Sequence, residues 1–476
     1  MATLIADRTA PASAARPGSP DGLRRRHLAL GLLVSAQFLV MLDASIVNVA
    51  LPSIQADLGL GPAAVTWVVN AYVLAFAGLL LLSGRAADMF GRRRIFVGGA
   101  LLFTVGTLTA ALSMNEALLI LGRAVQGVGA AALSPAAMSM LLATFPAGQR
   151  ARAMGAWGAA STLGGASGVV VGGLLAGSVG WRAVFLVTIP VSLAAAVLAP
   201  RVLEDGIPGI RRTFDWLGAV AVTAAVITLV HGAVDAVDHG WTSPRVACLV
   251  GASAVLMMAF VLAERRAIDP LIPLDLVRTR AVSKGVAVAF LGGSVRASTF
   301  VLVALYFQQA LAMSPQQAGF AMVPTSLTGF AVSLVVLPRV LRAIGPERSL
   351  VLGLTVLAAG QFWLALWPGT SGYAIAVLPG LLLVATGVAL SFTPTTMVVT
   401  SVVPEAQTGL ASGMAAAAMQ VGGAIGTAVF VVVGISVAGP TSAALDTGGF
   451  SAAFTAAALV ALTAAILGSR LTPPRP

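Results

Sequence analysis

Long apolar runs recur along the whole chain, and they leave very few folds open to it. Each run holds about 20 predominantly apolar residues, the length that an α-helix needs to cross the hydrocarbon core of a bilayer. Of 476 residues, 58% are hydrophobic and 9% are charged, and the mean hydropathy is +0.96. Soluble globular chains do not have this composition. The sequence therefore predicts an all-α polytopic membrane protein.

Charged breaks divide the apolar sequence into fourteen predicted spans, among them 183–199, 318–338 and 350–367. Of the 28 Lys and Arg residues, 24 lie in the first segment, the even-numbered breaks and the last segment. Only Arg182 and Arg245 lie in odd-numbered breaks. Because cytoplasmic loops carry the excess of Lys and Arg, both termini are predicted to be cytoplasmic, in a multi-pass protein of the plasma (inner) membrane. The net charge of +11 is spread between the runs, so no nucleic-acid partner is expected.

An internal repeat relates the two ends of the chain. Pro146 precedes the pair Gly164-Gly165 by 18 residues, and Pro404 precedes Gly422-Gly423 by the same distance. Equal spacing in two hydrophobic halves indicates a pseudo-symmetric transporter that binds its substrate between the halves. The alternative is a chance match, since the chain contains 52 glycines.

Two ionisable residues, Asp43 and Arg123, lie deep inside apolar runs of the first half. An ionisable side chain inside a span costs roughly 2.5 to 3.5 kcal/mol on insertion scales, so each should have a partner or a water-filled cavity. No other acid lies deep in the first six runs, which makes Asp43 the expected partner of Arg123. Such a pair either couples transport to protonation of Asp43 or only fixes helix packing.

The break after the second run reads GRAADMFGRRR at 84–94. Gly84 and Gly91 allow a tight turn and a close helix approach, while Asp88 is placed to meet a helix N-terminus or a neighbouring arginine. A contact that forms in one conformation and breaks in another would gate the inner face, with Arg92 and Arg93 as further gating residues. The alternative is that the arginines only anchor anionic lipid headgroups.

These segments resemble motifs of the major facilitator superfamily. The loop at 84–94 is similar to its motif A, and the stretch around Asp43 resembles the first span of the fourteen-span drug:proton antiporters. Further similarity extends over nearly the whole chain, at LGRAVQGVGAA (121–131, motif B), WRAVF (181–185), YFQQ with SPQQAG (306–309 and 314–319) and GLASG (409–413).

The resemblance implies two six-helix bundles with two additional helices between them, and transport by alternating access. The expected divisions are a disordered cytoplasmic tail (1–27), an N-terminal bundle (28–200), a linker with the two additional helices (201–283), a C-terminal bundle (284–470) and a short tail (471–476). In this family the arginine at the position of Arg123 works with acids of the first bundle in proton coupling, which makes Asp43 and Arg123 the expected proton-coupling residues.

The fifth span departs from the antiporter pattern because it lacks the proline of motif C. The glycines at this place still allow a bend and a close helix contact, so a helix-packing motif is expected. It comprises Gly164, Gly168, Gly172 and Gly173.

Polar and aromatic side chains within spans are candidates for a substrate cavity. Arg296 favours neutral, zwitterionic or anionic cargo, unless it faces the neighbouring bundle and snorkels or pairs there. Most of the others are equally compatible with helix packing. The candidates are Gln37, Gln126, Trp157, Arg296 and Gln308.

The expected function is proton-coupled efflux of an amphipathic small molecule, such as an antibiotic, a drug or a secondary metabolite. A proton-coupled metabolite symporter, or a membrane protein of this fold without transport activity, is the alternative. The sequence shows neither a catalytic constellation nor a large soluble segment, so no enzyme is expected. It has no nucleotide-binding loop of the Walker type and no zinc-ligand spacing, so no metal site or cofactor is expected and the proton gradient is the expected energy source. The expected partners are cargo, protons and membrane lipids, with the protein acting as a monomer.

Overall fold

In the computed structural model the apolar runs form α-helices, as their length and hydropathy predict. The structure describes residues 20–204, 215–267, 270, 272, 276, 278–313, 315–366, 372–438 and 447–471, and these ranges contain no β-strand. The predicted tails, 1–27 and 471–476, lie largely outside the described residues, but residues 20–27, part of the predicted disordered tail, form the first turns of a helix. The helices of the first half are α1 (Pro20–Leu58), α2 (Pro62–Phe90), α3 (Arg92–Ala111), α4 (Glu116–Thr144), α5 (Ala147–Ser178), α6 (Trp181–Leu186) and α7 (Ile189–Val202).

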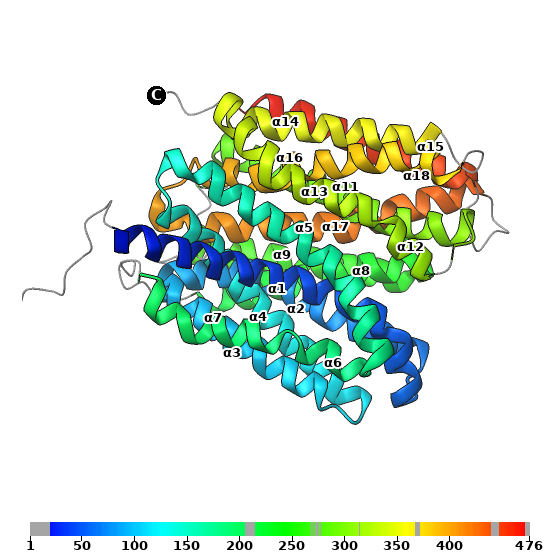
Figure 1. Ribbon diagram of the computed structural model, residues 1–476, viewed down its shortest axis with the longest axis horizontal. Helices are drawn as coiled ribbons and strands as arrows, with labels where there is room; N and C mark the ends of the chain where they lie inside the picture. The colour runs from blue at the N-terminus through cyan, green and yellow to red at the C-terminus, as the bar shows by residue number, and fades with distance from the viewer. Residues whose placement is uncertain are drawn as a thin grey trace, which may run out of the picture.

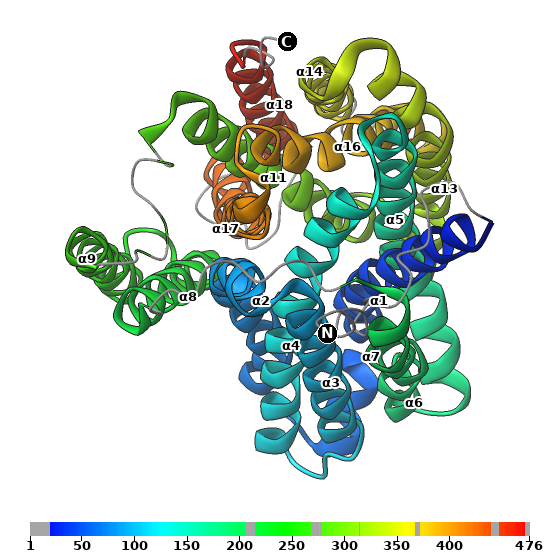
Figure 2. The same cartoon turned by 90° about the vertical axis from the view of Figure 1, so that its left-hand side faces the viewer.

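The second half follows two helices that pack against each other, α8 (Trp216–His239) and α9 (Pro244–Arg266). Figure 2 shows this pair at one side of the molecule, with α8 next to α2. The remaining helices are α11 (Arg280–Leu305), η1 (Tyr306–Ala310), α12 (Pro315–Ala321), α13 (Val323–Ala331), η2 (Val332–Val336), α14 (Leu337–Leu366), α15 (Tyr373–Ala376), α16 (Leu378–Thr400), η3 (Glu405–Gln407), α17 (Thr408–Ala438) and α18 (Thr447–Ser469).

The structure adds detail to the predicted spans at two places, each beside a proline. The predicted span 183–199 is interrupted between α6 and α7 just before Pro190, because proline has no N–H group to donate to the preceding turn, although Val187 and Thr188 keep helical dihedral angles. The predicted spans 318–338 and 350–367 are separate helical segments that follow each other without a loop and meet at Gly345, which has a non-helical φ of 80° and directly precedes Pro346. Among the described residues, thirteen helices are long and apolar enough to cross a membrane, and the bent run Gln317–Leu366 is one of them. The count of fourteen spans and the cytoplasmic location of the termini stay predictions.

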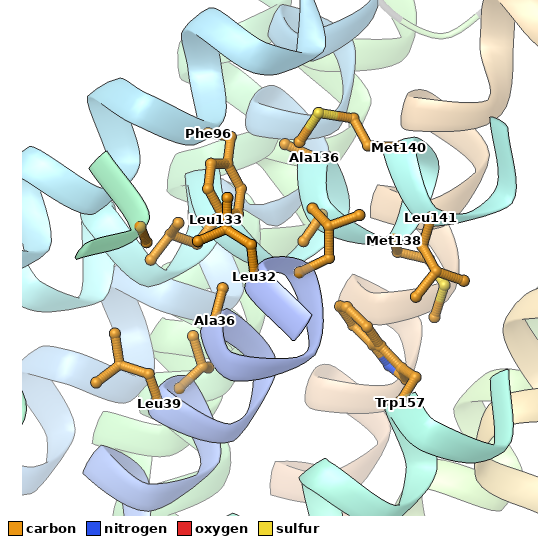
Figure 3. Close-up of a cluster of buried hydrophobic side chains, with 14 of the residues drawn as sticks. Leu32, Ala36, Leu39, Phe96, Leu133, Ala136, Met138, Met140, Leu141 and Trp157 are labelled. Atoms are coloured by element: carbon orange, nitrogen blue, oxygen red, sulfur yellow. The ribbon is translucent and has the colours of Figure 1, made fainter. Parts of the chain in front are cut away.

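Each half has its own apolar core. In the first half, side chains of α1, α3, α4 and α5 interlock, among them Leu39, Phe96, Leu133 and Trp157 (Figure 3). In the second half the core lies around Phe307, Phe450 and Phe454. In Figure 1 the first half runs from blue through cyan to the green of α6 and α7, and the second half runs from the yellow-green of α11 to red, while the predicted domain limits at 201 and 284 stay predictions.

The internal repeat is visible in helix crossings that occur twice. A Cβ atom on Gly129 of α4 would lie 2.7 Å from the carbonyl oxygen of Gly99 in α3, and one on Gly387 of α16 would lie 2.7 Å from that of Gly353 in α14. Likewise, Gly164 of α5 meets the carbonyl of Phe38 in α1, and Gly422 of α17 meets that of Phe290 in α11. These glycine contacts relate α1 to α11, α3 to α14, α4 to α16 and α5 to α17.

The halves meet on two sides: α2 and α4 pack on α17, and α5 packs on α13, η2, α14 and α16. α1 begins near the end of the molecule where the C-terminus is marked in Figure 1. Several loops and helix ends are joined there, since Arg25 of α1 pairs with Glu204 and Lys284 of α11 donates to the carbonyl of Arg470. We call this the inner end, after the predicted cytoplasmic location of the termini.

Candidate functional site

Asp43 and Arg123 form a buried ion pair between α1 and α4. Arg123 Nη1 lies 2.8 Å from Asp43 Oδ2, and the exposed fractions of the two side chains are 2% and 0%. The pairing expected from the sequence is therefore present. Removing one partner of such a buried pair costs about 3–5 kcal/mol, because it leaves the other charge uncompensated.

Three helices besides α1 supply the remaining contacts of the pair. From α4, Gln126 Nε2 donates to the second carboxylate oxygen of Asp43 at 3.0 Å and to Thr107 Oγ1 of α3 at 2.9 Å. From α2, the Val68 carbonyl accepts from Arg123 Nε at 3.1 Å, and the Tyr72 ring centroid lies 4.4 Å from the guanidinium carbon. Both carboxylate oxygens thus have donors, and the whole cluster is satisfied internally.

The cluster joins four helices of the first half through one ionisable acid. Neutralising Asp43 with a proton would weaken its bond to Arg123 and leave the guanidinium with a carbonyl, an amide and an aromatic face. Since a buried polar network depends on every partner, one proton on Asp43 would weaken the contacts that join these four helices. This is the chemistry that a coupling site needs.

The glycines of α5 form the surface on which the Asp43 segment of α1 rests. A Cβ atom on Gly164 would lie 2.5 Å from the carbonyl oxygen of Phe38, and one on Gly172 would lie 2.8 Å from that of Ile46. Gly168 faces the carbonyl of Leu42, 2.9 Å from its would-be Cβ. Gly173 does not share this close approach, because it is exposed and its nearest neighbour, Val49, would be 3.8 Å away. The helix-packing motif therefore consists of the first three glycines, even without the proline.

Gly164→Ala is expected to destabilise the protein by about 1–3 kcal/mol, the usual cost of overpacking, because the added methyl group would press on the backbone of α1 beside Asp43. Gly165→Ala is the matched control, since a Cβ at the next residue would meet nothing within 4 Å. Thermal unfolding of the two purified variants checks this. Equal melting temperatures would contradict the role given to the glycine stripe.

Asp88 joins the two halves at the inner end. It lies near the end of α2, and its carboxylate accepts the backbone N–H groups of Gly409 at 3.1 Å and Leu410 at 2.8 Å. These N–H groups belong to the first turn of α17, where backbone donors have no partner in their own helix and the helix dipole favours an anion. Both contacts expected for Asp88 occur, because Arg92 Nη2 also lies 3.3 Å from Oδ1.

Glycine backbones bring α2 and α17 close enough for this contact. A Cβ on Gly84 would lie 2.5 Å from the Gly409 carbonyl oxygen, and one on Gly409 would lie 2.6 Å from Asp88 Oδ1. Gly91 has a φ of 99°, which lets the chain turn from α2 into α3.

The two arginines after this turn point to different halves. Arg92 Nη2 also donates to the carbonyl of Glu405, which precedes α17. Arg93 Nη1, by contrast, donates to the carbonyls of Pro200 and Leu203 within the first half. The gating role of these residues stays a prediction.

The candidate cavity residues fall into different environments. Gln126 belongs to the Asp43 cluster, and Trp157 is packed in the apolar core next to Met138 and Leu141 (Figure 3), so their place in a substrate cavity stays a prediction. Gln37 bridges Ser161 and Ser134 inside the first half. Gln308 lies exposed in η1, beyond the end of α11. Arg296 is buried in the second half, bonded to Ser391.

Sequence reasoning did not anticipate the roles of Gln126, Thr107 and Tyr72. The sequence did indicate that Gln126 could join Arg123, because it lies three residues after Arg123 and therefore on the same helix face. Thr107 and Tyr72 reach the cluster from α3 and α2, and only the packing of these helices shows that.

Comparison with known proteins agrees with this architecture. Residues 33–427 match the family described as Major Facilitator Superfamily. The chain is 38% identical to the cephamycin export protein CmcT of Amycolatopsis lactamdurans, over 89% of this chain and 88% of that protein. It is 36% identical to the puromycin resistance protein pur8 of Streptomyces alboniger, over 94% and 88%.

Solved structures share the fold at low sequence identity. The human organic anion transporter MFSD10 superposes with a TM-score of 0.67 at 16% identity, covering 94% of this chain and 100% of that one. The proton:xylose symporter XylE gives the same TM-score and identity over 95% and 97%. With its all-helical bundles and a family match across most of its length, the chain belongs to the major facilitator superfamily and is a multi-pass membrane transporter of small molecules.

Proposed function

We propose that the protein exports an amphipathic small molecule, an antibiotic or another secondary metabolite, across the plasma membrane in exchange for protons. The buried ion pair of Asp43 and Arg123 carries this proposal, because it places one titratable carboxylate inside the membrane-spanning part of the first half. Relatives named for cephamycin export and puromycin resistance support the cargo class and the outward direction.

The two sites act in sequence in this scheme. Asp43 has no exposed surface in the present conformation, so it exchanges its proton only when the halves move and water reaches the pair. The contact of Asp88 with α17 holds the inner end closed, and its release opens the cytoplasmic side to cargo. The proton gradient supplies the energy, without a cofactor, and the protein works as a monomer among membrane lipids.

Proton exchange in inside-out membrane vesicles tests the proposal. With an acidic lumen, adding puromycin or a cephamycin to the outside should move protons out of the lumen as the cargo enters, which a pH-sensitive lumenal dye reports as alkalinisation. Protons and cargo moving in the same direction would indicate a symporter instead. Cargo uptake that does not depend on the pH gradient would refute proton coupling.

A further inference from the structure

Arg296 is a buried cation with unused hydrogen-bonding capacity. Only 5% of its surface is exposed, and Nη1 donates to Ser391 Oγ of α16 at 3.2 Å. Its guanidinium carbon lies 5.9 Å from the centre of the Phe392 ring. Nη2 is buried and has no hydrogen-bond partner within the described part of the chain.

No carboxylate in the described part of the chain forms an ion pair with this arginine. Among the described residues from 280 onward, the only acids are Glu347 and Glu405. Glu347 lies two residues after the Gly345 bend, and Glu405 lies in η3 just before α17, beside the Asp88 contact at the inner end. Since a charged side chain inside a membrane-spanning bundle is expensive without a counter-charge, a lone buried guanidinium points to a function rather than to packing.

The local structure makes room for the guanidinium. Gly292 lies one helical turn before Arg296, and a Cβ there would be 2.9 Å from Nη1 and 3.1 Å from Nη2. Ser391 is held in place because its hydroxyl donates to the Gly387 carbonyl at 2.7 Å, which leaves its oxygen to accept from Arg296. A glycine recess and an oriented hydroxyl thus hold one edge of the guanidinium and leave the Nη2 edge available.

The repeat places Arg296 at nearly the same depth as Asp43. Phe38 in α1 and Phe290 in α11 occupy the same crossing with α5 and α17, and Asp43 follows Phe38 by five residues. Five residues after Phe290 the chain has reached Val295, and Arg296 is next. The first half therefore holds a neutralised ion pair where the second half holds an unneutralised cation.

We propose that Arg296 binds a carboxylate group of the exported molecule, so that the cargo supplies the counter-charge that the second half lacks. This inference rests on the proposed export function and adds the chemical class of its substrate: amphipathic acids. Guanidinium groups suit this task, because their parallel N–H donors match the two oxygens of a carboxylate.

Binding of matched acid and ester probes tests this. Pyrenebutyric acid, naphthylacetic acid and a cephalosporin with a free carboxylate, each with its methyl ester, would be titrated onto the full-length protein in nanodiscs. In the unchanged protein at least one acid should bind about tenfold to a hundredfold more tightly than its ester, the range for a hydrogen bond to a charged group. In Arg296→Gln the ratio should fall to about one, and Arg296→Lys should retain part of it.

Ser349→Ala is the matched control. Its hydroxyl is buried between α14 and α16 and donates to the Leu390 carbonyl, next to Ser391, but it carries no charge. The acid-to-ester ratio should be unchanged in this variant. If Arg296 acts only in packing, its replacement by glutamine would weaken the binding of acid and ester equally.

An equal ratio in the unchanged protein and Arg296→Gln, including the case in which no acid binds preferentially, would overturn the inference. If the esters still enter inside-out vesicles in exchange for protons, the proposed export function would remain supported although the role of Arg296 would not.

Discussion

Asp43→Asn should reduce gradient-driven cargo accumulation to the level of vesicles that lack the protein. The amide is nearly isosteric and can still accept a hydrogen bond from Arg123 or Gln126, but it cannot ionise, so it cannot carry a proton between the two faces. One proton moving through 100 mV provides about 2.3 kcal/mol, or roughly a 50-fold accumulation ratio for a neutral cargo. Uptake of labelled cargo into inside-out vesicles with an acidic lumen should show this ratio falling to about one.

Asp57→Asn is the matched control for this experiment. Asp57 lies on the same helix, near the end of α1, where its half-exposed side chain pairs with Arg182 at 2.8 Å. Its loss should leave accumulation unchanged. Exchange of labelled for unlabelled cargo without a gradient should persist in Asp43→Asn, which would show that the variant is folded and still binds cargo. Full accumulation by Asp43→Asn would remove this residue from the coupling mechanism.

Asp88→Asn should shift the protein away from the conformation in which the inner end is closed. The carboxylate receives two backbone N–H groups of α17 and the Arg92 guanidinium, and its side chain is 3% exposed. Hydrogen bonds to charged groups contribute about 1.5–3 kcal/mol each. Losing the charge should therefore lower the closed population relative to the open one by about tenfold to a hundredfold.

Distances between spin labels across the inner end measure this shift. Labels would be attached at the exposed residues Arg94, at the start of α3, and Ser283, at the start of α11, after replacing the exposed Cys248 by serine. Double electron–electron resonance should show a longer distance becoming dominant in Asp88→Asn. Glu347→Gln, which removes an acid beside the Gly345 bend, should keep the original distribution. An unchanged distribution in Asp88→Asn would show that the contact does not hold this end closed.

The sequence predicts those parts of the structure that depend on single helices. Apolar runs of sufficient length predict the helices, and the scarcity of deep acids predicts that Arg123 pairs with Asp43. The contact of Asp88 with a helix N-terminus could be anticipated in kind, because a carboxylate complements unpaired N–H groups wherever it meets them. That the helix is α17, more than 300 residues later, could be expected only by family resemblance.

The parts that could not be predicted depend on which helix faces meet. Trp157 looked suitable for a cavity because it is aromatic and lies in a span, but its face of α5 packs into the core with Met138 and Leu141. The glycines of α5 suggested close packing without showing that they rest against the turn of α1 that bears Asp43. Spacing within one helix says which residues share a face, whereas the neighbour of that face is set by the tertiary fold.

The donors and the acceptor of the Asp88 contact differ in how far they tolerate amino-acid substitution. Two of its three donors are main-chain N–H groups, which remain present whatever side chain residue 410 carries, proline excepted. The acceptor is a single carboxylate, and residue 409 must stay small because a Cβ there would press on it. Substitutions in the first turn of α17 other than at residue 409 should therefore leave this contact in place, while the acid facing it has no substitute of equal reach and charge.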